Sequence, residues 1–147
     1  MKYSKDICKA LKIAYKAHDG QVDKCGMPYI FHPFCVAEQL ENEDEIITAL
    51  LHDVAEDTDI GIDELKTEGF NEKIIQALTL LTRDSRMPYF DYVERIKGNE
   101  IARKVKIADL KHNSDRSRME AVFDEIDEKS EKRFEKYQKA LEILQGE

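Results

Sequence analysis

Apolar residues recur at the spacing of an α-helix along almost the whole chain. Ile7, Leu11 and Ala14 share one face of a predicted helix that Ser4 caps and that ends near Gly20. Similar patterns predict further helices over residues 33–40, 42–54, 62–69, 71–81, 88–97, 101–113 and about 130–144. Because no pair of strands is evident, we expect an all-α protein, a compact helical bundle of about seven to nine helices.

The most continuous apolar run lies at residues 46–51, Ile-Ile-Thr-Ala-Leu-Leu. A helix that is apolar nearly all round is usually buried, so we expect this helix at the centre of the bundle. The stretch 19–31 contains two glycines and Pro28 and is predicted to be a loop. A length of 147 residues suits one core, so residues 1–147 are expected to form a single domain.

The charge of the chain narrows the choice of partners. Its 31 acidic and 23 basic residues give a formal net charge of −8 at pH 7. Coulomb repulsion makes such a chain a poor ligand for nucleic acid or an anionic membrane, and we expect neither. No apolar run approaches the ~20 residues that cross a bilayer, and the N-terminus lacks the apolar segment of a signal peptide. We therefore expect a cytoplasmic protein, whose oligomeric state stays open.

A group of ionisable residues follows the central apolar run: His52, Asp53, Glu56 and Asp57. Ionisable groups that are buried need partners or a metal ion. A spacing of four on a helix places His52 over Glu56 and Asp53 over Asp57. The first pair is therefore suited to ligate a cation, and the two carboxylates one turn away are placed to hold or deprotonate a water molecule.

Two further residues extend this set of candidate ligands. His32 precedes a proline, and Asp109 is a lone carboxylate in an apolar stretch of a later predicted helix. Together with His52 and Asp53 they offer nitrogen and oxygen donors, a mixture that suits Mn²⁺, Fe²⁺ or Zn²⁺ better than Ca²⁺. The sequence therefore predicts one divalent metal ion bound by His32, His52, Asp53 and Asp109.

These residues, in this order, also carry a resemblance. The stretches that share it are AHDGQ at 17–21, GMPYIFHP at 26–33, ALLHDVAEDT at 49–58 and VKIADLKHN at 105–113. Through them the chain resembles the HD superfamily of metal-dependent phosphohydrolases. Within that superfamily it is most similar to the hydrolase domain of RelA/SpoT-type alarmone enzymes and to their small stand-alone relatives. The similarity covers most of the chain up to about Asn113.

The resemblance implies an HD-type helical domain that acts on a small nucleotide. The implied reaction is removal of the 3′-pyrophosphate from guanosine tetra- or pentaphosphate. The metal ligands of the family, which usually bind Mn²⁺, fall on the four residues named above, and the carboxylate pair that acts on the attacking water falls on Glu56 and Asp57. This assignment agrees with general chemistry, because a divalent metal activates water and offsets phosphate charge while a nearby carboxylate accepts the proton.

One loop departs from the pattern of the alarmone hydrolases. Those enzymes usually carry an Arg-Lys pair before Gly-x-Pro-Tyr, with the arginine against the guanine, whereas this chain has Asp23-Lys24. Lys24 and Asn113 remain predicted substrate contacts, and Arg116 is expected to replace part of the lost positive charge. A carboxylate at Asp23 is expected to repel a polyphosphate, so that Asp23→Arg would improve kcat/KM for guanosine tetraphosphate about tenfold.

Two alternative functions stay open. Asp23 favours an HD-type phosphohydrolase for another small nucleotide or phosphoester. The second alternative is a non-catalytic nucleotide-binding module, although such a module has no need for Glu56 and Asp57. Of the two remaining histidines, His18 is interpreted as structural, bonding across the loop that follows it. His112 either faces the pocket or lies on the surface.

Overall fold

The structure is a computed structural model that describes residues 1–146. The described residues form ten helices: α1 (Lys5–Ala17), α2 (Phe31–Glu38), α3 (Glu43–Leu51), α4 (Val54–Asp57), α5 (Ile62–Thr67), α6 (Glu72–Leu81), α7 (Tyr89–Lys97), α8 (Glu100–Asn113), α9 (Arg116–Glu120) and α10 (Glu128–Gln145). The predicted all-α bundle is confirmed, and the additional helices are the short segments α4 and α9. Extended pairing within residues 1–146 is limited to one antiparallel bridge between Val22 and Pro28.

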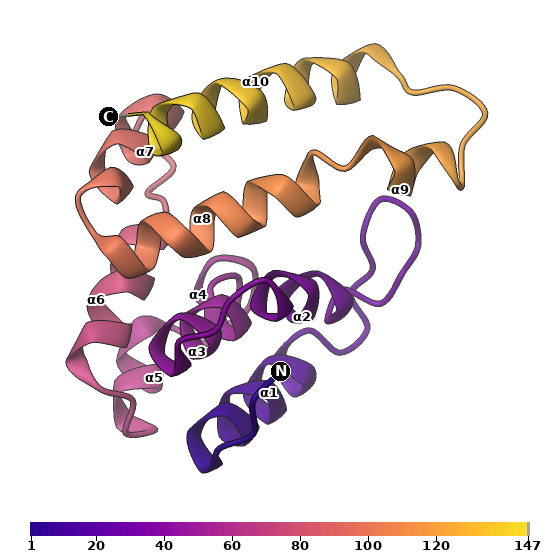
Figure 1. Ribbon diagram of the computed structural model, residues 1–147. Coiled ribbons are helices and arrows are strands. Elements are labelled where there is room, and N and C mark those ends of the chain that lie inside the picture. The colour runs from indigo at the N-terminus through magenta and orange to yellow at the C-terminus, as the bar shows by residue number, and fades with distance from the viewer. Residues whose placement is uncertain (147) are drawn as a thin grey trace.

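Helix α3 lies at the centre of the bundle, as its apolar run predicted. It packs against α1, α2, α6 and α8, and Ile46, Ile47, Leu50 and Leu51 are at most 1% exposed. The long helix α10 runs beside α8 and α7 and covers the far side of α8 from α3 (Figure 1). This arrangement leaves the polar end of α3 and the C-terminal half of α8 facing each other across the middle of the molecule.

Polar side chains at the helix starts explain most of the boundaries. Asn42, Asn71 and Asn99 each accept a backbone N–H from the first turn of the helix that follows, which satisfies a donor that has no partner within the helix. Asp127 caps α10 in the same way.

Near the predicted site, the structure corrects the end of one helix and adds a helix that was not predicted. The predicted helix through residue 54 ends at Leu51, because the N–H of His52 bonds the carbonyl of Ala49, three residues back, and the chain restarts as α4. Helix α9 was not predicted, since its five residues, capped by Asp115, contain no apolar period. None of the helices within residues 1–146 has the length and apolar character needed to cross a bilayer.

Candidate metal centre and adjoining cavity

Four side chains from three parts of the fold converge at the centre of the molecule. His32 comes from α2, His52 and Asp53 from the turn between α3 and α4, and Asp109 from α8. The Nε2 atom of His32 lies 2.8 Å from Oδ1 of Asp109 and 3.5 Å from Oδ2 of Asp53. The Nε2 atom of His52 lies 3.2 Å from the same atom of Asp53 and 3.4 Å from that of Asp109. The fold therefore brings together all four predicted ligands.

The ring orientations fit a metal site. Nδ1 of His52 lies 2.5 Å from the carbonyl oxygen of Ala49, so it donates there and leaves the lone pair of Nε2 for the cluster. That Nε2 atom is buried, and no hydrogen-bond partner for it lies among the residues that the structure describes. His32, His52 and Asp109 each offer a ligand atom within 4.8 Å of the others. Two imidazoles and two carboxylates of this kind form a candidate site for a divalent transition metal.

Electrostatic interactions among the clustered residues shift their pKa values. Burial by itself lowers the pKa of His52, but the carboxylates of Asp53 and Asp109 outweigh burial and hold that pKa well above its usual value. Burial raises the pKa of Asp109, yet the Lys106 ammonium and the two histidines outweigh it and hold the pKa well below its usual value. The site therefore has the concentrated negative charge that a cation requires.

Two polar side chains on α8 orient Asp109. The ammonium of Lys106 donates to Oδ2 at 2.7 Å, and the amide of Asn113 donates to Oδ1 at 3.1 Å. Asn113 was a predicted substrate contact, whereas Lys106 was missed. Its spacing of three from Asp109 on one helix was the signal that could have found it.

The carboxylates of Glu56 and Asp57 lie on α4, beside the cluster. Burial, and then the neighbouring Asp53, raise the pKa of both. The hydroxyl of Tyr29 donates to Oδ2 of Asp53 at 2.7 Å and lies 3.5 Å from Oδ2 of Asp57. Tyr29, a residue that sequence reasoning missed, thus links Asp57 to the candidate ligand Asp53.

The remaining histidines brace the site. His18 is buried and its Nδ1 lies 2.8 Å from Oε1 of Gln21, whose amide donates to the carbonyl of Asp57 at 3.0 Å. This arrangement agrees with the structural role expected of His18. The ring of His112 stacks on that of His32 with 2.7 Å between their Nδ1 atoms. His112 therefore faces the site, and its contact holds the His32 ring with Nε2 toward the cluster.

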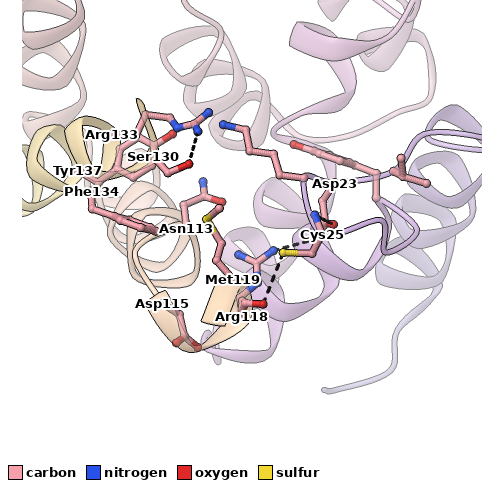
Figure 2. A pocket seen from close by; sticks show the side chains of 13 residues that line it. Asp23, Cys25, Asn113, Asp115, Arg118, Met119, Ser130, Arg133, Phe134 and Tyr137 are labelled. Atoms are coloured by element: carbon pink, nitrogen blue, oxygen red, sulfur yellow. Dashed lines mark hydrogen bonds and ion pairs between the residues drawn. The ribbon is translucent and has the colours of Figure 1, made fainter. Parts of the chain in front are cut away.

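A cavity of about 330 Å³ adjoins the cluster, and Tyr29 and Asn113 form part of both. Its walls come from the loop before α2, the end of α8, α9 and α10, and Figure 2 shows side chains from these elements around it. Three of its lining residues are basic: Lys24, Arg118 and Arg133. The cavity thus has the volume of a small-molecule site, with one end beside the candidate metal site and both basic residues and two aspartates, Asp23 and Asp115, in its walls.

The predicted substrate contacts divide into two groups. Lys24 and Asn113 line the cavity, as expected. Arg116 does not line it, because its guanidinium makes a double hydrogen bond to the carboxylate of Glu131 at 2.6 and 2.8 Å on the outer surface. The structure places Arg118 and Arg133 at the cavity instead. Neither was found from sequence, since the elements that carry them are distant from the motifs.

The structure also corrects the expectation for Asp23. Its carboxylate lies at the cavity but is not a free charge. Oδ1 accepts the backbone N–H groups of Cys25 and Met27 at 2.8 and 3.0 Å, and Oδ2 pairs with the guanidinium of Arg118 at 3.1 Å. Asp23 therefore shapes its loop and is neutralised by an arginine from α9. The repulsion that we expected between Asp23 and a polyphosphate is largely removed by this pairing.

Asp23→Arg is consequently expected to destabilise the protein without improving turnover of guanosine tetraphosphate. The new side chain would meet Arg118 and leave two backbone N–H groups without their acceptor. We expect the free energy of unfolding to fall by about 1–3 kcal/mol, measured by urea unfolding. Asp19→Arg, at an exposed position of the same loop, is the matched control. A tenfold gain in kcat/KM with unchanged stability would contradict this prediction.

The fold and the cluster together define a helical domain whose central helices carry a histidine–aspartate cluster that is a candidate metal site. Comparison with known families agrees with this class: the HD domain family matches residues 10–122, which is most of the chain. The chain belongs to the HD domain family.

Individual relatives narrow the similarity further. The chain is 36% identical over 91 residues to guanosine-3′,5′-bis(diphosphate) 3′-pyrophosphohydrolase of Aquifex aeolicus, an alignment of 59% of this chain and 13% of that protein. It is 34% identical over 122 residues to a probable enzyme of the same name from Synechocystis sp., with 73% and 16% covered. The chain therefore spans less than one fifth of the length of these relatives.

A solved structure shares the fold over the whole domain. It is described as a metazoan ortholog of SpoT that hydrolyzes ppGpp, and it superposes on this chain with a TM-score of 0.82. The alignment covers 99% of this chain and 89% of the other at 22% sequence identity. The overall fold prediction is confirmed by this match.

Proposed function

We propose that this chain is a metal-dependent phosphohydrolase that removes the 3′-pyrophosphate from guanosine tetra- or pentaphosphate, with one Mn²⁺ as cofactor. The observation that carries the proposal is the convergence of His32, His52, Asp53 and Asp109 at one end of a cavity with basic walls. The names and activities of the relatives in Aquifex and Synechocystis support the choice of substrate.

In the proposed reaction the four clustered residues would hold the metal ion. When bound, that ion supplies the acidity that lets a water molecule ionise near neutral pH and offsets charge on the diphosphate. A carboxylate oxygen of Glu56 or Asp57 accepts the proton of the attacking water, and the raised pKa of both makes them stronger bases than ordinary carboxylates. One water is consumed and the 3′ ester linkage breaks, which gives pyrophosphate together with guanosine diphosphate from the tetraphosphate or guanosine triphosphate from the pentaphosphate.

Other residues of the chain bind and orient the substrate. Lys24 and Arg133 line the cavity, and no carboxylate lies within ion-pair distance of either in the part of the chain that the structure describes. Their charges are therefore available to phosphate groups. Asn113 donates to Asp109 and lines the cavity, which supports a role as a contact between the candidate metal site and the substrate.

A second candidate keeps this chemistry and changes the substrate to another small nucleotide or phosphoester. The observation that favours it is the identity of residue 23, an aspartate committed to Arg118 where the alarmone hydrolases that this chain resembles carry an arginine. A screen for phosphate and pyrophosphate release over nucleotides, with Mn²⁺ present, separates the two candidates. Release of pyrophosphate from guanosine tetraphosphate in preference to the other nucleotides is the expected result. Turnover of a nucleoside monophosphate alone would support the second candidate, and binding without turnover would leave a nucleotide-binding module.

Metal affinity is expected to fall as the pH decreases. A ligand histidine must be deprotonated, and the raised pKa of His52 means that a proton competes for Nε2 even above pH ~6.5. Each unit of pH below that pKa should weaken binding of Mn²⁺ up to about tenfold, because the metal must displace one proton. Calorimetric titration of the metal-free protein between about pH 6 and about pH 8 measures this. A dissociation constant that is constant over this range would contradict the prediction.

A further inference from the structure

The guanidinium of Arg118 is fixed in place at the wall of the cavity. Its Nη1 atom donates to the carbonyl oxygen of His112 at 2.9 Å, and its Nη2 atom donates to Oδ2 of Asp23 at 3.1 Å. The thiol of Cys25 also donates to the backbone carbonyl of Arg118 at 3.5 Å. These contacts join α9 to a loop 95 residues earlier in the chain and hold the planar group in one orientation (Figure 2).

The charge of Arg118 is compensated, unlike that of the other two cations of the cavity. Asp23 forms an ion pair with it, and both side chains are mostly shielded from solvent, with 27% and 16% exposure. Lys24 and Arg133 have no such partner among the described residues. Arg133 and Ser130 lie on one side of the cavity and Arg118 with Asp23 on the other, with Asn113 between them (Figure 2).

A compensated, immobilised guanidinium is better suited to a nucleobase than to a phosphate. Its attraction for an anion is reduced by the adjacent carboxylate, whereas its flat surface is kept in place without further loss of side-chain entropy. Guanidinium planes stack on bases in single-stranded nucleic acids, and arginine does this where lysine cannot. The sulfur atoms of Cys25 and Met119, which also line the cavity, extend the apolar character of this wall.

We propose that Arg118 is the base-contacting residue of this cavity and determines its preference for a nucleotide over a phosphate compound without a base. The inference rests on the proposed function for the identity of the ligand. The phosphates of the same ligand lie toward Lys24, Arg133 and the candidate metal site.

The two products of the proposed reaction separate a base contact from a phosphate contact, since guanosine diphosphate carries a base and pyrophosphate carries none. We would measure the dissociation constants of both by calorimetry on the protein with Mn²⁺, for Arg118→Ala and Arg118→Lys. Arg118→Lys keeps a cation beside Asp23 but removes the flat guanidinium. In both variants the dissociation constant for guanosine diphosphate is expected to rise about tenfold or more, and that for pyrophosphate to stay within about twofold.

Controls guard against a purely structural effect. Arg103→Ala on α8 removes an arginine that does not line the cavity and should leave both dissociation constants unchanged. Thermal unfolding of Arg118→Lys should show a melting temperature close to that of the wild-type protein. An equal weakening of both ligands would overturn the proposal, because it would make Arg118 a phosphate contact or a structural brace. Unchanged affinity for guanosine diphosphate would overturn it as well.

The same measurements distinguish failure of this inference from failure of the proposed function. If wild-type protein does not hydrolyse guanosine tetraphosphate but binds guanosine diphosphate in a manner that depends on Arg118, the inference stands and the proposed reaction is wrong. If wild-type protein hydrolyses the alarmone and the Arg118 variants bind guanosine diphosphate normally, the reaction stands and the inference is wrong.

Discussion

Asp53→Ala is expected to abolish both metal binding and turnover. Oδ2 of Asp53 lies within 3.5 Å of the Nε2 atoms of His32 and His52, as Oδ1 of Asp109 does, so it is one of two carboxylate atoms that face both rings. Its removal takes a negative charge from a buried site in which few replacements are available. Metal analysis of protein purified without chelator should show about one divalent ion per wild-type chain and close to none for the variant.

Two further variants separate the loss of a metal ligand from the loss of a charge and from a loss of folding. Asp91→Ala, an exposed aspartate on α7, controls for loss of charge and should retain the metal. Asp53→Asn keeps the shape of the side chain and an acceptor for the hydroxyl of Tyr29, so it preserves folding while weakening the metal site. A wild-type protein that purifies without metal and does not take up added Mn²⁺ would show that the cluster is a structural ion-pair network.

Glu56→Gln and Asp57→Asn are expected to keep the metal and to lose most of the activity. Each amide keeps the shape of the side chain and removes the basic oxygen, and general-base catalysis is worth about 10²- to 10⁴-fold in rate. The loss should appear in kcat, with metal content unchanged. Comparison of the two variants identifies the base, and the two carboxylates differ in that Oδ2 of Asp57 lies 3.5 Å from the hydroxyl of Tyr29.

If both variants turn over at the wild-type rate, Glu56 and Asp57 have a structural role and neither is the general base. Glu135→Gln, on an exposed part of α10, provides a control for the loss of one carboxylate. A variant that loses metal as well as activity would instead assign its carboxylate to the ligand set.

Local sequence patterns predicted most of the helices and the buried centre of the bundle. The apolar run at 46–51 predicted the buried centre because a helix without a polar face has no stable position at the surface. Asn71 predicted a helix start because an amide oxygen next to free N–H groups acts within a single turn, whereas the cap that Asn99 provides for α8 was found only in the structure. Helix α9 was not predicted, because a segment of five residues is too short for its apolar spacing to distinguish a helix from a turn.

The sequence by itself determined which residue types are available for chemistry and their spacing along the chain. His52, Asp53, Glu56 and Asp57 are close in sequence and therefore close in space, but the helix break that puts the first two in the turn between α3 and α4 was not predicted. Tertiary structure decided everything that depends on a partner far along the chain. From the sequence Asp23 is an unpaired negative charge, but the fold brings Arg118 to within 3.1 Å of it. Arg116 was predicted to contact substrate, and the fold instead pairs its guanidinium with Glu131 away from the residues that line the cavity. The physical reason is that the effect of a charge depends on which neighbours surround it in space, and sequence spacing does not report neighbours 95 residues apart.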